Sequence, residues 1–303
     1  MIRTFLFIVF LAMALCIVAY AQTAITPKTP FTSKDVDLWK QMQARRSEGQ
    51  RESQNIAAGE PFKVLGNLYS VGIPIGNSFL LTSTQGHILL NTGYAESAEQ
   101  MGKNIEALGF KLSDIKILLP THWHNDGGGG TAYFKEKTGA SVMAGAGDIG
   151  FLQAGGEGSQ KVPAVKVDRA IFNGDVITLG PVSVTAHAIP GHTPGSTSFS
   201  FKVREENQDY TVFQYCCGQN IPQNFSANPN YSDAGMRHTF EVFRKVLPVD
   251  VYVWGPSSGF FLAERLAKYK VGNRLAFVDR STFPAFAAWL EVEYETKVRN
   301  PAQ

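Results

Sequence analysis

Two histidines and an aspartate stand at alternate positions in the segment "PTHWHND", a spacing that suits a metal ion. His122, His124 and Asp126 follow the apolar run "IKILL", which ends at Pro120. Residues i, i+2 and i+4 of an extended segment point to the same side, so the three side chains can converge. Imidazole nitrogens and a carboxylate are ligands with which zinc keeps a position open for water. With only six histidines in the chain, we favour a metal site over a chance meeting of surface residues.

A third histidine stands in a second glycine- and proline-rich motif, "PGHTPGSTS". His192 follows a predicted strand over residues 182–189 and lies in a tight turn that would hold its ring rigidly. Alone it would be an ordinary loop histidine. Together with His122 and His124 it supplies the third ligand of a tetrahedral site whose fourth position is water. The remaining histidines have no such motif and are predicted to be structural or surface residues: His87, His187 and His238.

The chain has three cysteines, of which Cys216 and Cys217 are adjacent. Neighbouring cysteines rarely form a disulfide, because the small ring that they close is strained, so none is expected here. The favoured interpretation is that both end a buried strand as small apolar residues. The alternative is that Cys217 supplies a thiolate, an excellent zinc ligand, and forms a weak second metal site with Asp126.

The first 21 residues predict a secretory signal peptide. Arg3 is the only charge before a long apolar run, and Ala19-Tyr20-Ala21 fits the small-x-small rule for cleavage after Ala21. An uncleaved anchor helix is the alternative, since the run is close to spanning length. We therefore expect a periplasmic or secreted protein that is not held at a membrane after cleavage.

Composition limits the classes of partner. The 28 Lys and Arg residues against 26 Asp and Glu give a net charge of +2, with no basic run that would suit nucleic acid. A small-molecule substrate is expected, and the sequence does not fix an oligomeric state.

Beyond the signal peptide, residues 22–60 are predicted to form a leader and one charged helix. Residues 61–303 then read as a single domain of short strands alternating with single helices. This order favours two sheets faced with helices over a doubly wound parallel sheet. Helices are predicted over about 33–52, 96–108, 234–247 and 283–298.

Three motifs in order resemble the metallo-β-lactamase superfamily: "LLNTG" (89–93), "THWHNDGGGG" and "PGHTPGSTS". Longer stretches, among them "GDVITLGPVSVTAHAIPGHTPGSTS", are most similar to the third subclass of class B β-lactamases, and the resemblance covers roughly residues 61–300. It implies an α/β (α+β) fold, the four-layer αββα sandwich, with zinc at the edge between the sheets. By this resemblance His122, His124 and His192 match the first zinc site, and Asp126 matches a ligand of the second.

The chain departs from the family pattern at the second zinc site. Gly127 stands where the family has a histidine after the aspartate, and no histidine occurs near Pro256 or Ser257, where the family supplies another. One zinc site is therefore expected, with a second that is degenerate.

The resemblance implies a β-lactamase that opens the β-lactam amide with a zinc-bound hydroxide, mono-zinc or weakly dizinc, and so an antibiotic-resistance protein. Asp126 would orient the water or act as general base. Because a fold does not fix a function, two alternatives remain. One is a hydrolase of another ester, lactone, thioester or phosphoester, and the other is a non-catalytic zinc-binding relative.

Overall fold

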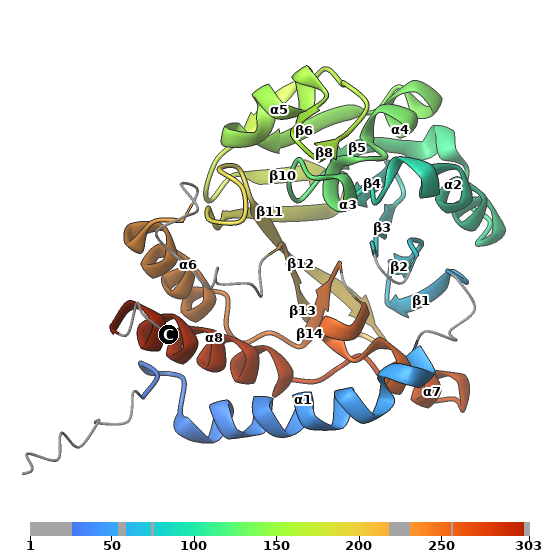
Figure 1. Ribbon diagram of the computed structural model, residues 1–303. Helices are drawn as coiled ribbons and strands as arrows, with labels where there is room; N and C mark the ends of the chain where they lie inside the picture. Colours follow the sequence, from blue (N-terminus) through green and yellow to red (C-terminus); the bar gives the residue numbers. More distant parts are fainter. Residues whose placement is uncertain (1–25, 54–58, 74–75, 218–230, 256, 300–303) are drawn as a thin grey trace, which may run out of the picture.

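The computed structural model contains two β-sheets enclosed by helices (Figure 1). It describes residues 26–53, 59–73, 76–217, 231–255 and 257–299. The predicted signal peptide and Pro256 lie outside these ranges. Within them, no helix has both the length and the apolar character that crossing a membrane requires.

The first sheet has seven strands in the order β1-β2-β3-β4-β5-β6-β9. The pairs from β1 to β4 are antiparallel, and those from β4 to β9 are parallel. The strands are β1 (Phe62–Leu65), β2 (Leu68–Ser70), β3 (Phe79–Ser83), β4 (Gly86–Leu90), β5 (Ile115–Leu119), β6 (Ser141–Gly145) and β9 (Arg169–Ile171).

The second sheet has five strands in the order β10-β11-β12-β13-β14, antiparallel except for the last, parallel pair. Its strands are β10 (Val176–Leu179), β11 (Val182–Ala188), β12 (Thr197–Glu205), β13 (Gln208–Tyr215) and β14 (Val251–Trp254). A separate short hairpin is formed by β7 (Gly156–Glu157) and β8 (Gln160–Lys161).

The helices predicted from the sequence are present, and several short ones are added. The α-helices are α1 (Ser33–Ser53), α2 (Ala98–Ala107), α3 (Asn125–Gly128), α4 (Thr131–Thr138), α5 (Ile149–Ala154), α6 (Asp233–Lys245), α7 (Leu262–Lys270) and α8 (Thr282–Arg299). The 3₁₀ turns are η1 (Ala95–Ser97), η2 (Leu112–Asp114), η3 (Ala146–Asp148) and η5 (Ser257–Phe260).

Apolar residues of β5 alternate between two hydrophobic clusters, so both faces of the first sheet are covered. Ile117 and Leu119 join the cluster that fills the space between the sheets and continues to α6 and α8. Leu118 between them joins the cluster beneath α2, α4 and α5. A parallel sheet buried on both faces needs such continuous apolar runs. The arrangement confirms the predicted αββα sandwich.

The N-terminal helix α1 lies against the C-terminal helix α8 (Figure 1). Trp39 of α1 is fully buried, and its ring centroid lies 5.2 Å from that of Phe286 in an edge-on arrangement. The apolar face of this helix therefore includes Trp39 as well as Leu38 and Met42, which contact the same cluster.

The two sheets are joined by a main-chain hydrogen bond at the edge where the histidine motifs lie. The Thr197 amide, at the start of β12, donates to the Thr121 carbonyl oxygen just after β5, at 2.8 Å. The connection between β11 and β12 therefore lies beside the loop that leaves β5. Each loop carries part of the predicted metal site.

Candidate metal centre

The first part of the site is the connection from β5 to α3. Thr121 to His124 form bends, and Asp126 lies in the first turn of α3, so the two histidines and the aspartate do not all belong to one extended segment. The His122 ring is buried, and its Nε2 lies 3.1 Å from Asp126 Oδ1. The predicted convergence is thus present, but the start of a helix produces it.

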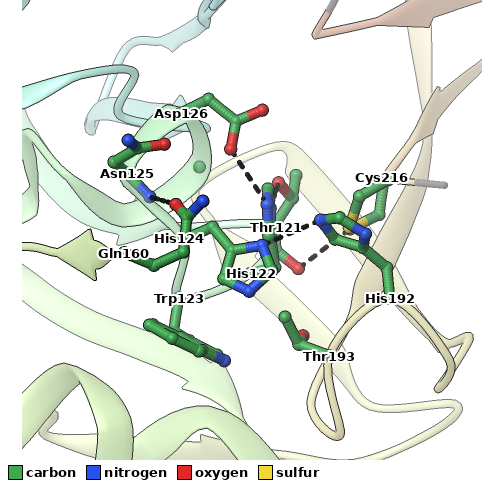
Figure 2. Close-up of polar contacts among 12 residues, drawn as sticks. Thr121, His122, Trp123, His124, Asn125, Asp126, Gln160, His192, Thr193 and Cys216 are labelled. Carbon is green, nitrogen blue, oxygen red and sulfur yellow. Dashed lines mark hydrogen bonds and ion pairs between the residues drawn. A yellow bond between two sulfur atoms is a disulfide. The ribbon is translucent and has the colours of Figure 1, made fainter. Parts of the chain in front are cut away.

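His192 approaches from the turn between β11 and β12 (Figure 2). Its Nε2 lies 2.9 Å from His124 Nδ1, and its ring centroid lies 4.9 Å from that of His122. The rings of His122 and His124 are 5.1 Å apart. Three imidazoles from two segments therefore share one small volume, as the sequence predicted.

His124, His192 and Asp126 are in the protonation states that a metal ion needs. Burial, together with the charge of His122, lowers the pKa of His124 to about 4 and that of His192 to about 3. Burial works against ionisation of Asp126, but the charges and contact of His122 and the charge of His192 outweigh it and lower the pKa to about 2. Near neutral pH, His124 and His192 are therefore neutral and Asp126 is a carboxylate.

The residues present fit a metal ion. Although His122 Nε2 lies close to Asp126, this buried atom makes no hydrogen bond of acceptable geometry, which is costly unless another partner binds it. The neighbouring nitrogens of His124 and His192 are 2.9 Å apart, close to the roughly 3.3 Å between two nitrogen ligands of one tetrahedral zinc. An ion among the three rings would give each a ligand role.

Asp148, at the end of η3, connects the two loops that carry the histidines, and it is not among the site residues predicted from the sequence. Its buried carboxylate accepts hydrogen bonds from the Trp123 amide (3.1 Å), the Thr193 hydroxyl (2.7 Å) and the Gly195 amide (2.7 Å). Burial raises its pKa, although these bonds oppose the change. The sequence feature that could have indicated Asp148 is its position three residues after β6, a strand whose carboxyl end lies at the site.

The glycine run is close-packed rather than a loose loop. A Cβ on Gly127 would lie 2.2 Å from His122 Nδ1, and one on Gly130 would lie 2.2 Å from the Thr92 carbonyl oxygen. Gly127 and Gly128 belong to α3, and Thr92 Oγ1 donates to the Gly127 carbonyl oxygen at 3.0 Å. The glycines allow the backbone to pass directly beneath the His122 ring.

A disulfide joins the adjacent residues Cys216 and Cys217. The expectation that adjacent cysteines stay unbonded is wrong here. Among the described residues, a group of ligand atoms within 4.8 Å of one another contains His122, His192 and Cys217. The group includes neither His124 nor Asp126, so it differs both from the set of three histidines and from the Asp126–Cys217 second site considered from the sequence. Cys216 is buried and Cys217 is partly exposed.

The other histidines lie outside this cluster. His187 bonds to the Ser200 hydroxyl at 2.7 Å, and burial lowers its pKa to about 4. His87 packs edge-on against Phe110, and His238 lies on α6. No histidine stands near Ser257 in η5, in the part of that region that the structure describes.

The fold, with three histidines and an aspartate at the edge between its sheets, defines a metallo-hydrolase, and the chain belongs to the metallo-β-lactamase superfamily. The family model matches residues 71–205. The structure is similar to BJP-1, a subclass B3 metallo-β-lactamase of Bradyrhizobium japonicum, with 33% identity, a TM-score of 0.74 and coverage of 81% of this chain and 96% of that one. It is also similar to a Cronobacter sakazakii metallo-β-lactamase described by a HARLDQ motif, with 28% identity, a TM-score of 0.74 and coverage of 83% and 99%.

Curated relatives carry a different activity in their names. A hydroxyacylglutathione hydrolase of Hyphomonas neptunium is 35% identical over 115 residues, which are 38% of this chain and 39% of that protein. A second, from a Bradyrhizobium species, is 29% identical over 126 residues. The chain thus spans about two fifths of the length of these relatives.

Proposed function

We propose that this protein is a zinc-dependent β-lactamase that uses one metal site. The extent of the structural likeness carries the proposal. The subclass B3 enzyme of B. japonicum is covered over 96% of its length, whereas the hydroxyacylglutathione hydrolase of H. neptunium is covered over 39%. The likeness to B3 enzymes thus extends over nearly their whole length, whereas the likeness to the hydroxyacylglutathione hydrolase extends over less than half of that protein.

His122, His124 and His192 would hold the ion. Zinc with three protein ligands lowers the pKa of a water molecule to about 7 and polarises a carbonyl group. Asp126, kept ionised beside His122, would accept a hydrogen bond from that water and orient it. Asp148 holds the loops that carry the histidines in position.

The residues around Asp126 support a single zinc. Gly127 offers no ligand, and its place under the His122 ring leaves no room for a side chain. The HARLDQ motif named for the C. sakazakii protein also has a residue other than histidine after its aspartate. A protein named as a metallo-β-lactamase thus also lacks a histidine directly after the aspartate, as this chain does at Gly127.

The second candidate is a thioester hydrolase. The names of the hydroxyacylglutathione hydrolases favour it. Three histidines and a carboxylate suit hydrolysis of either a strained amide or a thioester, so the ligand set does not decide between them. Other esters and lactones, and zinc binding without catalysis, remain outcomes of the same test.

We also propose that the protein is exported and acts on a small molecule. The apolar N-terminal segment supports export, and the near-neutral charge of the chain supports a small-molecule substrate over nucleic acid. Resistance to β-lactams would follow if the substrate is a β-lactam antibiotic.

Hydrolysis of a panel of β-lactams, a glutathione thioester, an oxygen ester and a lactone, with zinc titrated from none to excess, tests the proposal. We expect β-lactam turnover that saturates at one zinc per chain. His122→Ala should abolish it, while His238→Ala, on α6, should leave it unchanged. Thioester turnover alone would replace the first candidate by the second. Tight zinc binding without turnover of any substrate would exclude both.

A further inference from the structure

We infer that reduction of the Cys216–Cys217 disulfide releases Cys217 as a fourth protein ligand of the histidine metal site and thereby switches hydrolysis off. The inference rests on the proposed zinc site. It adds a ligand set that depends on the redox state of the chain.

The first support is the place of the sulfur. Ligand atoms of His122, His192 and Cys217 all lie within 4.8 Å of one another. Sulfur and nitrogen ligands of one tetrahedral zinc are about 3.6 Å apart, so a movement of roughly 1 Å would bring a free Cys217 thiolate to that spacing from the ligand atoms of His122 and His192. A thiolate is a better ligand for zinc than the water that it would displace.

The second support is that the surroundings suit two free thiols. Cys216 Sγ lies 3.2 Å from the Thr121 carbonyl oxygen, so a thiol there can donate a hydrogen bond without leaving its buried position (Figure 2). Cys217 Sγ lies 3.4 Å from the Ser196 hydroxyl. Both sulfurs therefore have polar neighbours that serve the reduced state.

The third support is access. Cys217 is partly exposed, whereas Cys216 is buried, so a reductant would meet the Cys217 sulfur first. A small dithiol attacks the disulfide, the S–S bond breaks, and its two electrons leave both cysteines as thiols. The dithiol becomes a cyclic disulfide. Cys217 then loses its proton to solvent as its sulfur binds the metal.

The consequence for activity follows from ligand count. With His122, His124 and His192, zinc keeps one position for water, as catalytic sites do. A fourth ligand from Cys217 makes a closed site of the kind that serves structure. The oxidised chain is thus the active form and the reduced chain the inactive one.

Cobalt(II) reports the ligand directly, since a cobalt–thiolate bond gives an intense near-ultraviolet charge-transfer band that nitrogen ligands do not. We would load the full chain with cobalt before and after treatment with a phosphine, which reduces the disulfide by taking up one water oxygen and is a weaker metal ligand than a dithiol. We expect no band in the oxidised protein and a band at one cobalt per chain after reduction. Affinity should rise at least about ten-fold, since even outer-shell partners change metal affinity by that factor.

Two matched variants assign the band. Cys216→Ser leaves Cys217 free, so it should show the band and low hydrolysis without any reductant. Cys217→Ser should show no band under either condition, and phosphine should not change its rate of hydrolysis. Free-thiol counting on the wild type, which needs no variant to fold, must rise by two on reduction.

The outcomes separate this inference from the proposed function. Cobalt bound by reduced wild type without a thiolate band would overturn the inference and leave the histidine site standing. A band that persists in Cys217→Ser would overturn it as well, because the ligand would be Cys216. A reduction-dependent band in a protein that hydrolyses nothing would support the cysteine ligand and overturn the proposed hydrolase and the switch in activity.

Discussion

Replacing Gly127 by alanine should displace His122 while leaving the fold intact. The added Cβ would lie 2.2 Å from His122 Nδ1, whereas ordinary contact begins at 3.4 Å. The ring must therefore move by about 1.2 Å. The added Cβ would also lie 2.8 Å from the His122 carbonyl oxygen, so that contact would be strained as well.

The size of the effect follows from this movement. A misplacement of about 1 Å in a catalytic constellation can cost about 100-fold in rate, equivalent to about 2.7 kcal/mol. We expect hydrolysis to fall by about that factor and zinc affinity to fall by about 10- to 100-fold. The helix itself should tolerate the change, since alanine is the better helix former.

The assay is competition for zinc against a chromophoric chelator, followed by hydrolysis at saturating zinc. Gly150→Ala is the matched control, because Gly150 lies in helix α5 and a Cβ there would meet nothing within 4 Å. The control should keep its zinc affinity. Wild-type affinity and turnover in Gly127→Ala would refute the argument that His122 needs a residue without a side chain beneath it.

Two further predictions concern stability. Asp148→Asn keeps the shape of the side chain, but its NH₂ group would face a backbone N–H that now donates to the carboxylate. The free energy of unfolding in urea should therefore fall by about 1–3 kcal/mol, and competition against a chelator should show weaker zinc binding. The control Asp209→Asn, in an exposed ion pair, should change neither the free energy of unfolding nor the zinc affinity. In metal-free protein the pKa values of His124 and His192 are lowered to about 4 and about 3 from 6.5. Between those values and 6.5 the unfolded chain binds more protons than the folded one, so the free energy of unfolding of metal-free protein should rise with pH across this window. A urea midpoint that stays constant from about pH 4.5 to 7 would contradict the burial of these rings.

The elements with strong periodicity were predictable from the sequence, and the site residues came from their spacing. The strand over 115–119 has a nearly continuous run of apolar residues, and the helix over 283–298 has apolar residues at helical spacing. Each pattern favours the element that buries those residues on one side or within a sheet. His122, His124 and His192 were found because glycine and proline mark the loops after two strands.

Other features depended on contacts between distant residues. Asp148 gains its role only when Trp123, Thr193 and Gly195 are brought to it, and no local pattern announces those partners. The disulfide was rejected on the general geometry of adjacent cysteines. The short helices α4 and α5 have too few residues for a clear period.

The contact between α1 and α8 sets an order on folding. Trp39 and Phe286 are separated by most of the chain, so the pocket for the indole, which Phe261 also lines, is incomplete until α8 has been synthesised. Long-range contacts of this kind form late and slow the folding of a domain. Until then the nascent chain exposes the Trp39 ring, and chaperones bind exposed hydrophobic surface of this kind. A ribosome that stops before residue 282 would release a chain in which Trp39 has lost that cover.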